Sequence, residues 1–161
     1  MLVKPIKIRV EPQVITDFEK LARKAFPKET LAYLLGVRKG NRIAIMDLWT
    51  PEDVGDYCTD SNVITPKHWD AEAHEHAEEE GWNVIGDIHS HPYTYTELEN
   101  RRKRLKGKPE MEELNWPSSQ DWYGRCGHLW ITGVCLVKED KLKRLSTNIM
   151  LFGPLLALEE L

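Results

Sequence analysis

The chain has 161 residues, of which 41% are hydrophobic and 30% charged, and it carries a formal net charge of −4 with a pI near 5.9. This length fits one ordinary domain with its own core, and the composition excludes a disordered chain. The negative net charge provides no basic field for a nucleic acid backbone, so no nucleic acid partner is predicted.

The cysteines and the apolar segments indicate the cellular compartment. The sequence has three cysteines, Cys58, Cys126 and Cys135. An odd number of cysteines without a C-x-x-C pair predicts reduced, structural thiols. The first ten residues lack the apolar core and cleavage site of a signal peptide. The longest apolar stretches, such as 149–158, are shorter than the roughly 20 residues of a membrane-spanning helix. We therefore expect a cytoplasmic protein without membrane contact.

The N-terminal part predicts a strand, a helix and a hairpin. Alternating apolar residues indicate a strand over Ile6–Val10, and helical spacing from Pro12 to Ala25 indicates a helix that Pro27 closes. Two apolar runs, Thr30–Val37 and Arg42–Trp49, flank a short turn and are typical of a β-hairpin.

The middle of the chain predicts a second helix, a strand and a charged segment. Pro66 opens a helix to about Glu80, and Asn83–His89 follows as a strand. The stretch Tyr93–Trp116 holds six basic and five acidic residues with few apolar ones. We expect this stretch to be an insertion that leaves the core.

The C-terminal part predicts a short helix from Ser118 to about Arg125 and two strands, Gly127–Val137 and Lys143–Phe152. The element order is then β, α, ββ, α, β, α, ββ. This order predicts a single α/β (α+β) domain over residues 1–161, with a mixed central β-sheet flanked by helices.

The first candidate for chemistry is His89-Ser90-His91, at the end of a predicted strand. Side chains at i and i+2 of a strand point to the same face, so both imidazoles can reach one cation. Neutral imidazole is a preferred zinc ligand. A second H-x-H motif, His74-Glu75-His76, falls inside a predicted helix, where residues two apart diverge, and it is assigned to the surface.

The second candidate is Ser118-Ser119-Gln120-Asp121. A serine followed three residues later by an acidic residue is a helix-capping pattern, which needs no metal. A cap would also fix the direction of Asp121. Two histidines and one carboxylate leave the fourth tetrahedral position of zinc open for water, which is the catalytic rather than the structural pattern.

A hydrolytic zinc site also needs a group that takes a proton from water and passes it to the leaving amine. Glu29, in Pro27-Lys28-Glu29-Thr30, is a carboxylate at the entry to a strand. Taken alone, it is better explained as a surface glutamate.

Together these segments resemble a known family. Three motifs resemble the signature of the JAMM (MPN-plus, JAB-type) zinc metalloproteases: P-x-E at 27–29, H-S-H-P at 89–92 and P-S-x-x-D at 117–121. The similarity runs in order from the helix that contains Val14 to the strand 127–137.

The resemblance implies a cytidine-deaminase-like MPN/JAMM fold with a Zn cofactor. His89, His91 and Asp121 match the zinc ligands, Glu29 matches the general acid/base, and Ser118 matches the residue that stabilises the oxyanion. The implied reaction is hydrolysis of a peptide or isopeptide bond, as by a deubiquitinase, and the implied partner is a ubiquitin-like or other protein or peptide substrate.

The chain departs from the family pattern at two places. Twenty-six residues separate His91 from Ser118, where the family has a much shorter spacer. The extra residues could form a flap that grips substrate, a regulatory lid, or a longer loop that leaves the ligands in place. Ala32 stands where the family often has glycine.

Two other functions stay open, and the oligomeric state is not predicted. One is a non-catalytic MPN-type scaffold, although such relatives typically lose metal ligands. The other is a zinc amidohydrolase that acts on a different peptide, such as a cell-wall or phage substrate, because fold and metal do not choose a substrate. The basic run Arg101–Lys108 could hold an acidic partner or nucleic acid, but the flanking glutamates favour a solvated charged loop.

Overall fold

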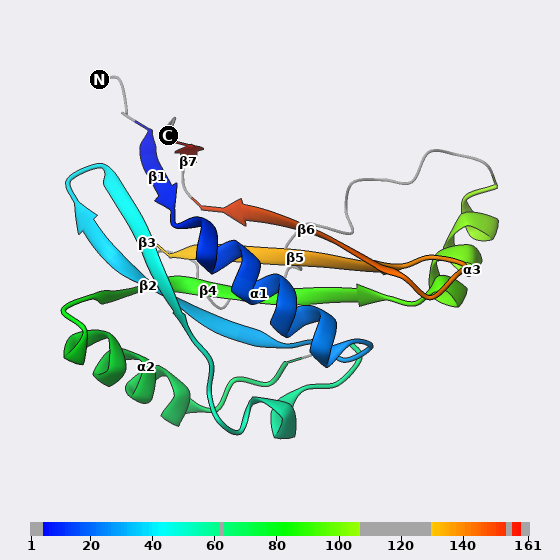
Figure 1. Cartoon of the computed structure of the whole chain (residues 1–161), viewed down its shortest axis with the longest axis horizontal. Coiled ribbons are helices and arrows are strands. Elements are labelled where there is room, and N and C mark those ends of the chain that lie inside the picture. The colour runs from blue at the N-terminus through cyan, green and yellow to red at the C-terminus, as the bar shows by residue number, and fades with distance from the viewer. Residues whose placement is uncertain (1–4, 62, 107–129, 154–155, 159–161) are drawn as a thin grey trace.

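The computed structural model describes residues 5–61, 63–106, 130–153 and 156–158. These residues form one seven-stranded mixed β-sheet with the strand order β6-β5-β4-β2-β3-β1-β7, and α-helices pack against it (Figure 1). The predicted α+β class with a mixed sheet and flanking helices is therefore confirmed.

The described elements follow the chain in an order close to the predicted one. None of the described helices is both long and apolar enough to span a membrane. The elements are β1 (Ile6–Val10), α1 (Pro12–Ala25), β2 (Leu31–Lys39), β3 (Arg42–Trp49), the 3₁₀ helix η1 (Val54–Tyr57), α2 (Lys67–Glu79), β4 (Asn83–Tyr93), α3 (Tyr95–Leu105), β5 (Ile131–Glu139), β6 (Leu145–Phe152) and β7 (Leu156–Leu158).

The middle of the sheet is formed by β2, β4 and β5. β2 pairs antiparallel with both β3 and β4, whereas β4 pairs parallel with β5. β6 lies antiparallel to β5 at one edge, and β1 pairs parallel with β3 and β7 near the other. The strands β2 and β4, far apart in sequence, are thus direct neighbours.

α1 covers one face of the sheet and forms the larger part of the core. Its buried residues Val14, Phe18 and Ala22 recur at helical spacing, so they line the side of the helix that faces the strands. They pack against even-numbered residues of β2 such as Leu34. α1 stops at Ala25 because a residue followed by proline, here Phe26, disfavours the helical conformation.

α2 covers part of the opposite face. Trp69, the largest fully buried side chain, packs with Ala73 and Ala77 of α2 against odd-numbered residues of β2, among them Tyr33. The Tyr33 hydroxyl donates a 2.7 Å hydrogen bond to Asp70 Oδ1. Odd-numbered residues of β2 therefore point to the α2 face and even-numbered ones to the α1 face.

Several predicted boundaries were wrong. β4 continues four residues past His89 to Tyr93, and β6 starts at Leu145 rather than Lys143, because Lys143 occupies a turn with φ +61°. β5, predicted over 127–137, starts at Ile131 and runs two residues past Val137. Residues 127–129 of the predicted range lie outside the described part. The strand β7 and the 3₁₀ helix η1 were not predicted.

The prediction that Arg101–Lys108 forms a charged loop was wrong for the residues that the structure describes. Residues up to Leu105 belong to the helix α3, which lies at the end of the sheet beside the β5–β6 hairpin (Figure 1). The first part of the insertion predicted over 93–116 is therefore regular structure: Tyr93 is the last residue of β4, and α3 follows it. Residues 107–116, like the predicted helix 118–125, lie outside the described residues.

Candidate functional site

His89 and His91 converge on one face of β4. His89 pairs with Leu31 across the β2–β4 ladder, and Leu31 packs in the cluster under α2, so both histidines point to the α2 face. The two Nε2 atoms are 2.9 Å apart, and the ring centroids are 4.8 Å apart. His89 is only 7% exposed, whereas His91 is partly exposed. The prediction that the strand brings both imidazoles together is confirmed.

The two rings are arranged in a way that fits a zinc ion. With Zn–N bonds of about 2.0–2.1 Å, two nitrogens of a tetrahedral site lie about 3.3 Å apart. The observed separation of 2.9 Å is slightly shorter, so a small opening of the two rings would admit the ion. At this distance, one Nε2 can instead donate a hydrogen bond to the other.

The start of β2 is tied to the H-S-H segment by a pair of hydrogen bonds. The Ser90 amide donates to the Thr30 carbonyl at 3.0 Å, and the Thr30 amide donates to Ser90 Oγ at 2.9 Å. Both residues are buried, with Ser90 0% exposed. Ser90 was not singled out from the sequence, and its position between the two histidines was the available signal.

These hydrogen bonds bring the segment that carries Glu29 next to the histidines. Leu31 is opposite His89 and Thr30 is bonded to Ser90, where the contact between the two segments ends; one further step of the same register would bring Glu29 to the level of His91. Glu29 itself lies two residues before the start of β2 and is partly exposed. The Glu29 amide donates to the Thr59 carbonyl at 2.7 Å, and this bond holds the backbone at the strand entry.

The negative charge of Glu29 acts on two neighbouring groups. Burial is the main cause that raises the pKa of Tyr93, and the Glu29 carboxylate adds to it while Arg101 opposes it. Burial also raises the pKa of Cys58 to about 11, again with a contribution from Glu29. The effect on Tyr93 indicates that the Glu29 carboxylate is within electrostatic range of the end of β4, and the effect on Cys58 agrees with the hydrogen bond between Glu29 and Thr59.

The remaining predicted residues, Ser118 and Asp121, lie outside the described residues. Within the described part of the chain, no three His, Cys, Asp or Glu side chains are grouped to hold a metal ion. The other H-x-H pair lies in α2 as predicted, with His74 exposed and the ring of His76 6.4 Å from that of Trp49. The free cysteines Cys58 and Cys135 are buried, as expected for structural thiols.

No curated protein matches the chain. Among solved structures, it is similar to a protein of Desulfitobacterium hafniense with a TM-score of 0.57 and 15% identity over 95% of this chain and 93% of the other. It also matches a protein of Salinibacter ruber with a TM-score of 0.48 and 17% identity, over 86% and 79% of the two chains. The first likeness shows a shared fold.

The family comparison reaches the site itself. The model of prokaryotic homologs of the JAB domain matches residues 11–97, which is more than half of the 161 residues. The matched range contains Glu29, His89 and His91 and ends before Ser118 and Asp121. The chain therefore belongs to the family of prokaryotic homologs of the JAB domain.

Proposed function

We propose that this chain is a zinc-dependent metallopeptidase that hydrolyses a peptide or isopeptide bond, with the tail of a ubiquitin-like protein as its substrate. One observation supports the proposal: two hydrogen bonds tie Thr30, the residue after Glu29, to Ser90, the residue between the two convergent imidazoles. A carboxylate beside a pair of convergent imidazoles is the arrangement that metal-assisted hydrolysis needs.

Each residue has a separate role in the proposed reaction. His89, His91 and Asp121 would hold the zinc, which when bound polarises the scissile carbonyl and lowers the pKa of water. Glu29 would accept a proton from the attacking water and deliver it to the leaving amine. The Ser118 hydroxyl would donate a hydrogen bond to the oxyanion that develops on the carbonyl oxygen.

The metal is tested by elemental analysis of the purified protein. We expect near-stoichiometric zinc in the wild type and its loss in both His89→Ala and Asp121→Ala. His74→Ala is the matched control, because His74 is an exposed residue of the second H-x-H, in α2, and its loss should leave the zinc content unchanged. Zinc-free protein after reconstitution would contradict the proposal and favour the scaffold function.

The acid/base role is tested by Glu29→Gln, which keeps the side-chain shape and removes the proton-accepting carboxylate. We expect kcat to fall by about 10²–10⁴-fold while the zinc content stays unchanged. Glu72→Gln, at an exposed position of α2, is the control and should retain full activity. Full activity of Glu29→Gln would exclude Glu29 as the proton carrier.

The substrate class is tested with a panel of cleavable bonds, because neither the fold nor a metal chooses the substrate. Ubiquitin-like fusions and isopeptide conjugates should be cleaved, and cell-wall or unrelated peptides should be cut more slowly. Cleavage of the second group alone would assign the chain to the zinc amidohydrolases that act on other peptides.

A further inference from the structure

The end of the sheet next to the histidines carries a concentration of positive charge, although the whole chain has a net charge of −4. We define the basic end as two segments. Residues 93–106 comprise the last residue of β4 and the helix α3, and residues 138–145 comprise the turn between β5 and β6 with the adjoining strand ends. Its basic residues are Arg101, Arg102, Lys103, Arg104, Lys106, Lys138, Lys141, Lys143 and Arg144, and its acidic residues are Glu97, Glu99, Glu139 and Asp140. Within these described residues the excess is five positive charges, so the rest of the chain, which includes Glu110, Glu112 and Glu113 outside the described part, is strongly acidic.

Most of the acidic groups of the basic end are already engaged within it. Glu99 is paired with Arg102, and Asp140 with Arg144 at 2.7 Å between Oδ2 and Nε. Glu139 accepts a 3.0 Å hydrogen bond from the Tyr95 amide. These contacts leave little negative charge to neutralise the exposed lysines and arginines.

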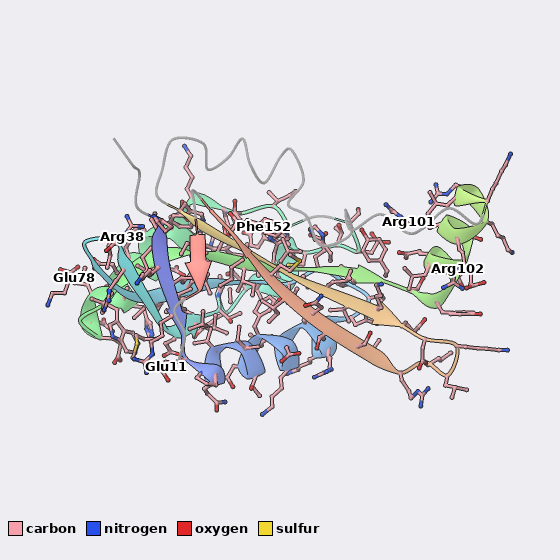
Figure 2. All side chains as sticks on the ribbon, turned by 90° about the horizontal axis from the view of Figure 1, so that it is seen from above. Glu11, Arg38, Glu78, Arg101, Arg102 and Phe152 are labelled. Atoms are coloured by element: carbon pink, nitrogen blue, oxygen red, sulfur yellow. The ribbon has the colours of Figure 1, made fainter. Side chains whose placement is uncertain are left out.

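The unengaged positive charge lies on the exposed surface. Within the described part of the chain, five exposed basic side chains of the basic end have no ion pair with an acidic group: Lys103, Arg104, Lys106, Lys141 and Lys143. Figure 2 shows Arg101 and Arg102 on α3 at one end of the molecule, with Arg38 near the opposite end.

α3 is held in a fixed place beside the site. The Thr94 hydroxyl caps the helix by accepting a hydrogen bond from the Glu97 amide, and the Tyr95 amide is bound by Glu139. Leu98 of α3 packs against Leu136 of β5 and Tyr93. Leu136 is the register partner of His91, so α3 rests on the strand position next to the imidazole.

We infer that the basic end docks an acidic polypeptide segment of the substrate and thereby positions the scissile bond at the histidines. This inference rests on the proposed peptidase function. Charge complementarity favours an acidic segment that is short enough to stay on the basic end, because a long, continuous phosphate backbone would extend over the acidic rest of the chain.

Binding is measured by fluorescence anisotropy with labelled acidic, neutral and basic peptides of equal length, on zinc-free protein and on Glu29→Gln. We expect binding of the acidic peptide only, weakened as ionic strength rises. The double variant Lys103→Glu/Arg104→Glu and the single variant Lys141→Glu should each weaken it, the double variant by about tenfold or more. Lys39→Glu is the control, because it makes the same charge change at the exposed end of β2 and should bind normally.

Two outcomes would overturn the inference. One is equal binding of neutral and acidic peptides, or no effect of the α3 and hairpin variants. The other is a labelled oligonucleotide that binds more tightly than the acidic peptide. Neither outcome touches the metal content or the role of Glu29, so a failure here is distinguishable from a failure of the proposed function.

Turnover gives an independent readout. With a substrate that carries an acidic segment beside the cleaved bond, Lys103→Glu/Arg104→Glu should raise KM by about tenfold and leave kcat unchanged. With a neutral substrate the same variant should match the wild type. An equal loss on both substrates would mean that α3 supports the fold rather than docks substrate, and would overturn the inference.

Discussion

At the scale of single residues, Ser90 is the link between the two halves of the site. Its hydroxyl accepts from the Thr30 amide, one residue from Glu29, while its backbone sits between the two histidines. A change at Ser90 therefore disturbs both the stability of the β2 entry and the position of the proposed acid/base. Ser90 is a positioning residue, because it acts through Thr30 and Glu29.

Ser90→Ala should lower the free energy of unfolding by about 1–3 kcal/mol, because it leaves the buried Thr30 amide without its acceptor. Denaturant unfolding of the wild type and the variant measures this difference. Ser146→Ala, at an exposed position of β6, is the matched control and should change stability little. If the two variants were equally stable, the Thr30 to Ser90 bond would have no net stabilising effect.

The buried thiols offer a second prediction at this scale. Burial is the main cause that raises the pKa of Cys58 to about 11 and that of Cys135 to about 12. At pH 8, few of these groups are thiolates, and the thiolate is the reactive form. In a Cys126→Ser background, native protein should react with a disulfide reagent at least about 100-fold more slowly than unfolded protein. Rapid native labelling of either cysteine would contradict the buried placement.

At the scale of elements, the spacing between β4 and β5 depends on Gly86, three residues before His89. A Cβ at Gly86 would lie 1.9 Å from the Ile131 carbonyl oxygen, a backbone atom that cannot move without shifting β5. Glycine is therefore required here for the close approach of two backbones, and not for an unusual φ angle.

Gly86→Ala should destabilise the protein by about 3 kcal/mol, at the upper end of overpacking costs, because the two strands must separate. Denaturant or thermal unfolding measures the loss. Gly55→Ala is the control, because a Cβ at Gly55 meets nothing within 4 Å. A Gly86→Ala variant as stable as the control would mean that the β4–β5 pair adjusts without cost.

Elements with a clear hydrophobic period could be predicted from the sequence, and others could not. The bounds of β1 and α1 follow from their alternation and helical spacing. α3 was missed because Leu98 is its one buried residue, so the helix has no hydrophobic period. It is held instead by the Thr94 cap, the hydrogen bond of Tyr95 to Glu139, and the packing of Leu98 on Leu136. Thr94-x-x-Glu97 is a capping-box pattern that could have located its start.

The end of β4 was misplaced because proline usually ends a central strand. Pro92 nevertheless pairs with Val137 of β5. On the other side, the ladder with β2 ends at His89, followed only by the hydrogen bond from the Ser90 amide to the Thr30 carbonyl. At Pro92 the strand therefore has a ladder neighbour on one side only, which is where proline is tolerated. The sequence alone does not reveal where the neighbouring strand stops.

At the scale of the whole molecule, the candidate site is built from residues that are sixty positions apart and meet only through the β2–β4 pairing. The sequence could predict the histidine pair, because its i, i+2 spacing lies within one strand. It could not place Glu29 from local patterns, because that position depends on the register of a distant strand. The family resemblance supplied that part of the prediction.

Because the two imidazoles and the segment that carries Glu29 are brought together by the folded sheet, the proposed zinc should bind the native protein and stabilise it. At a free zinc concentration near 100 times Kd, the gain is about 2.7 kcal/mol, which for a domain of this size raises Tm by about 5–10 °C. Thermal unfolding with zinc and with a chelator measures the shift.

The informative quantity is the zinc-dependent shift of each variant, since His89 is buried and His89→Ala also changes the basal Tm. His89→Ala should abolish the shift, whereas His74→Ala, at an exposed position of α2, should retain it in full. A shift that survived in His89→Ala and disappeared in His74→Ala would place the metal on α2. That result would separate the histidines of β4 from the proposed chemistry, because the hydrogen bonds of Thr30 tie the segment that carries Glu29 to β4.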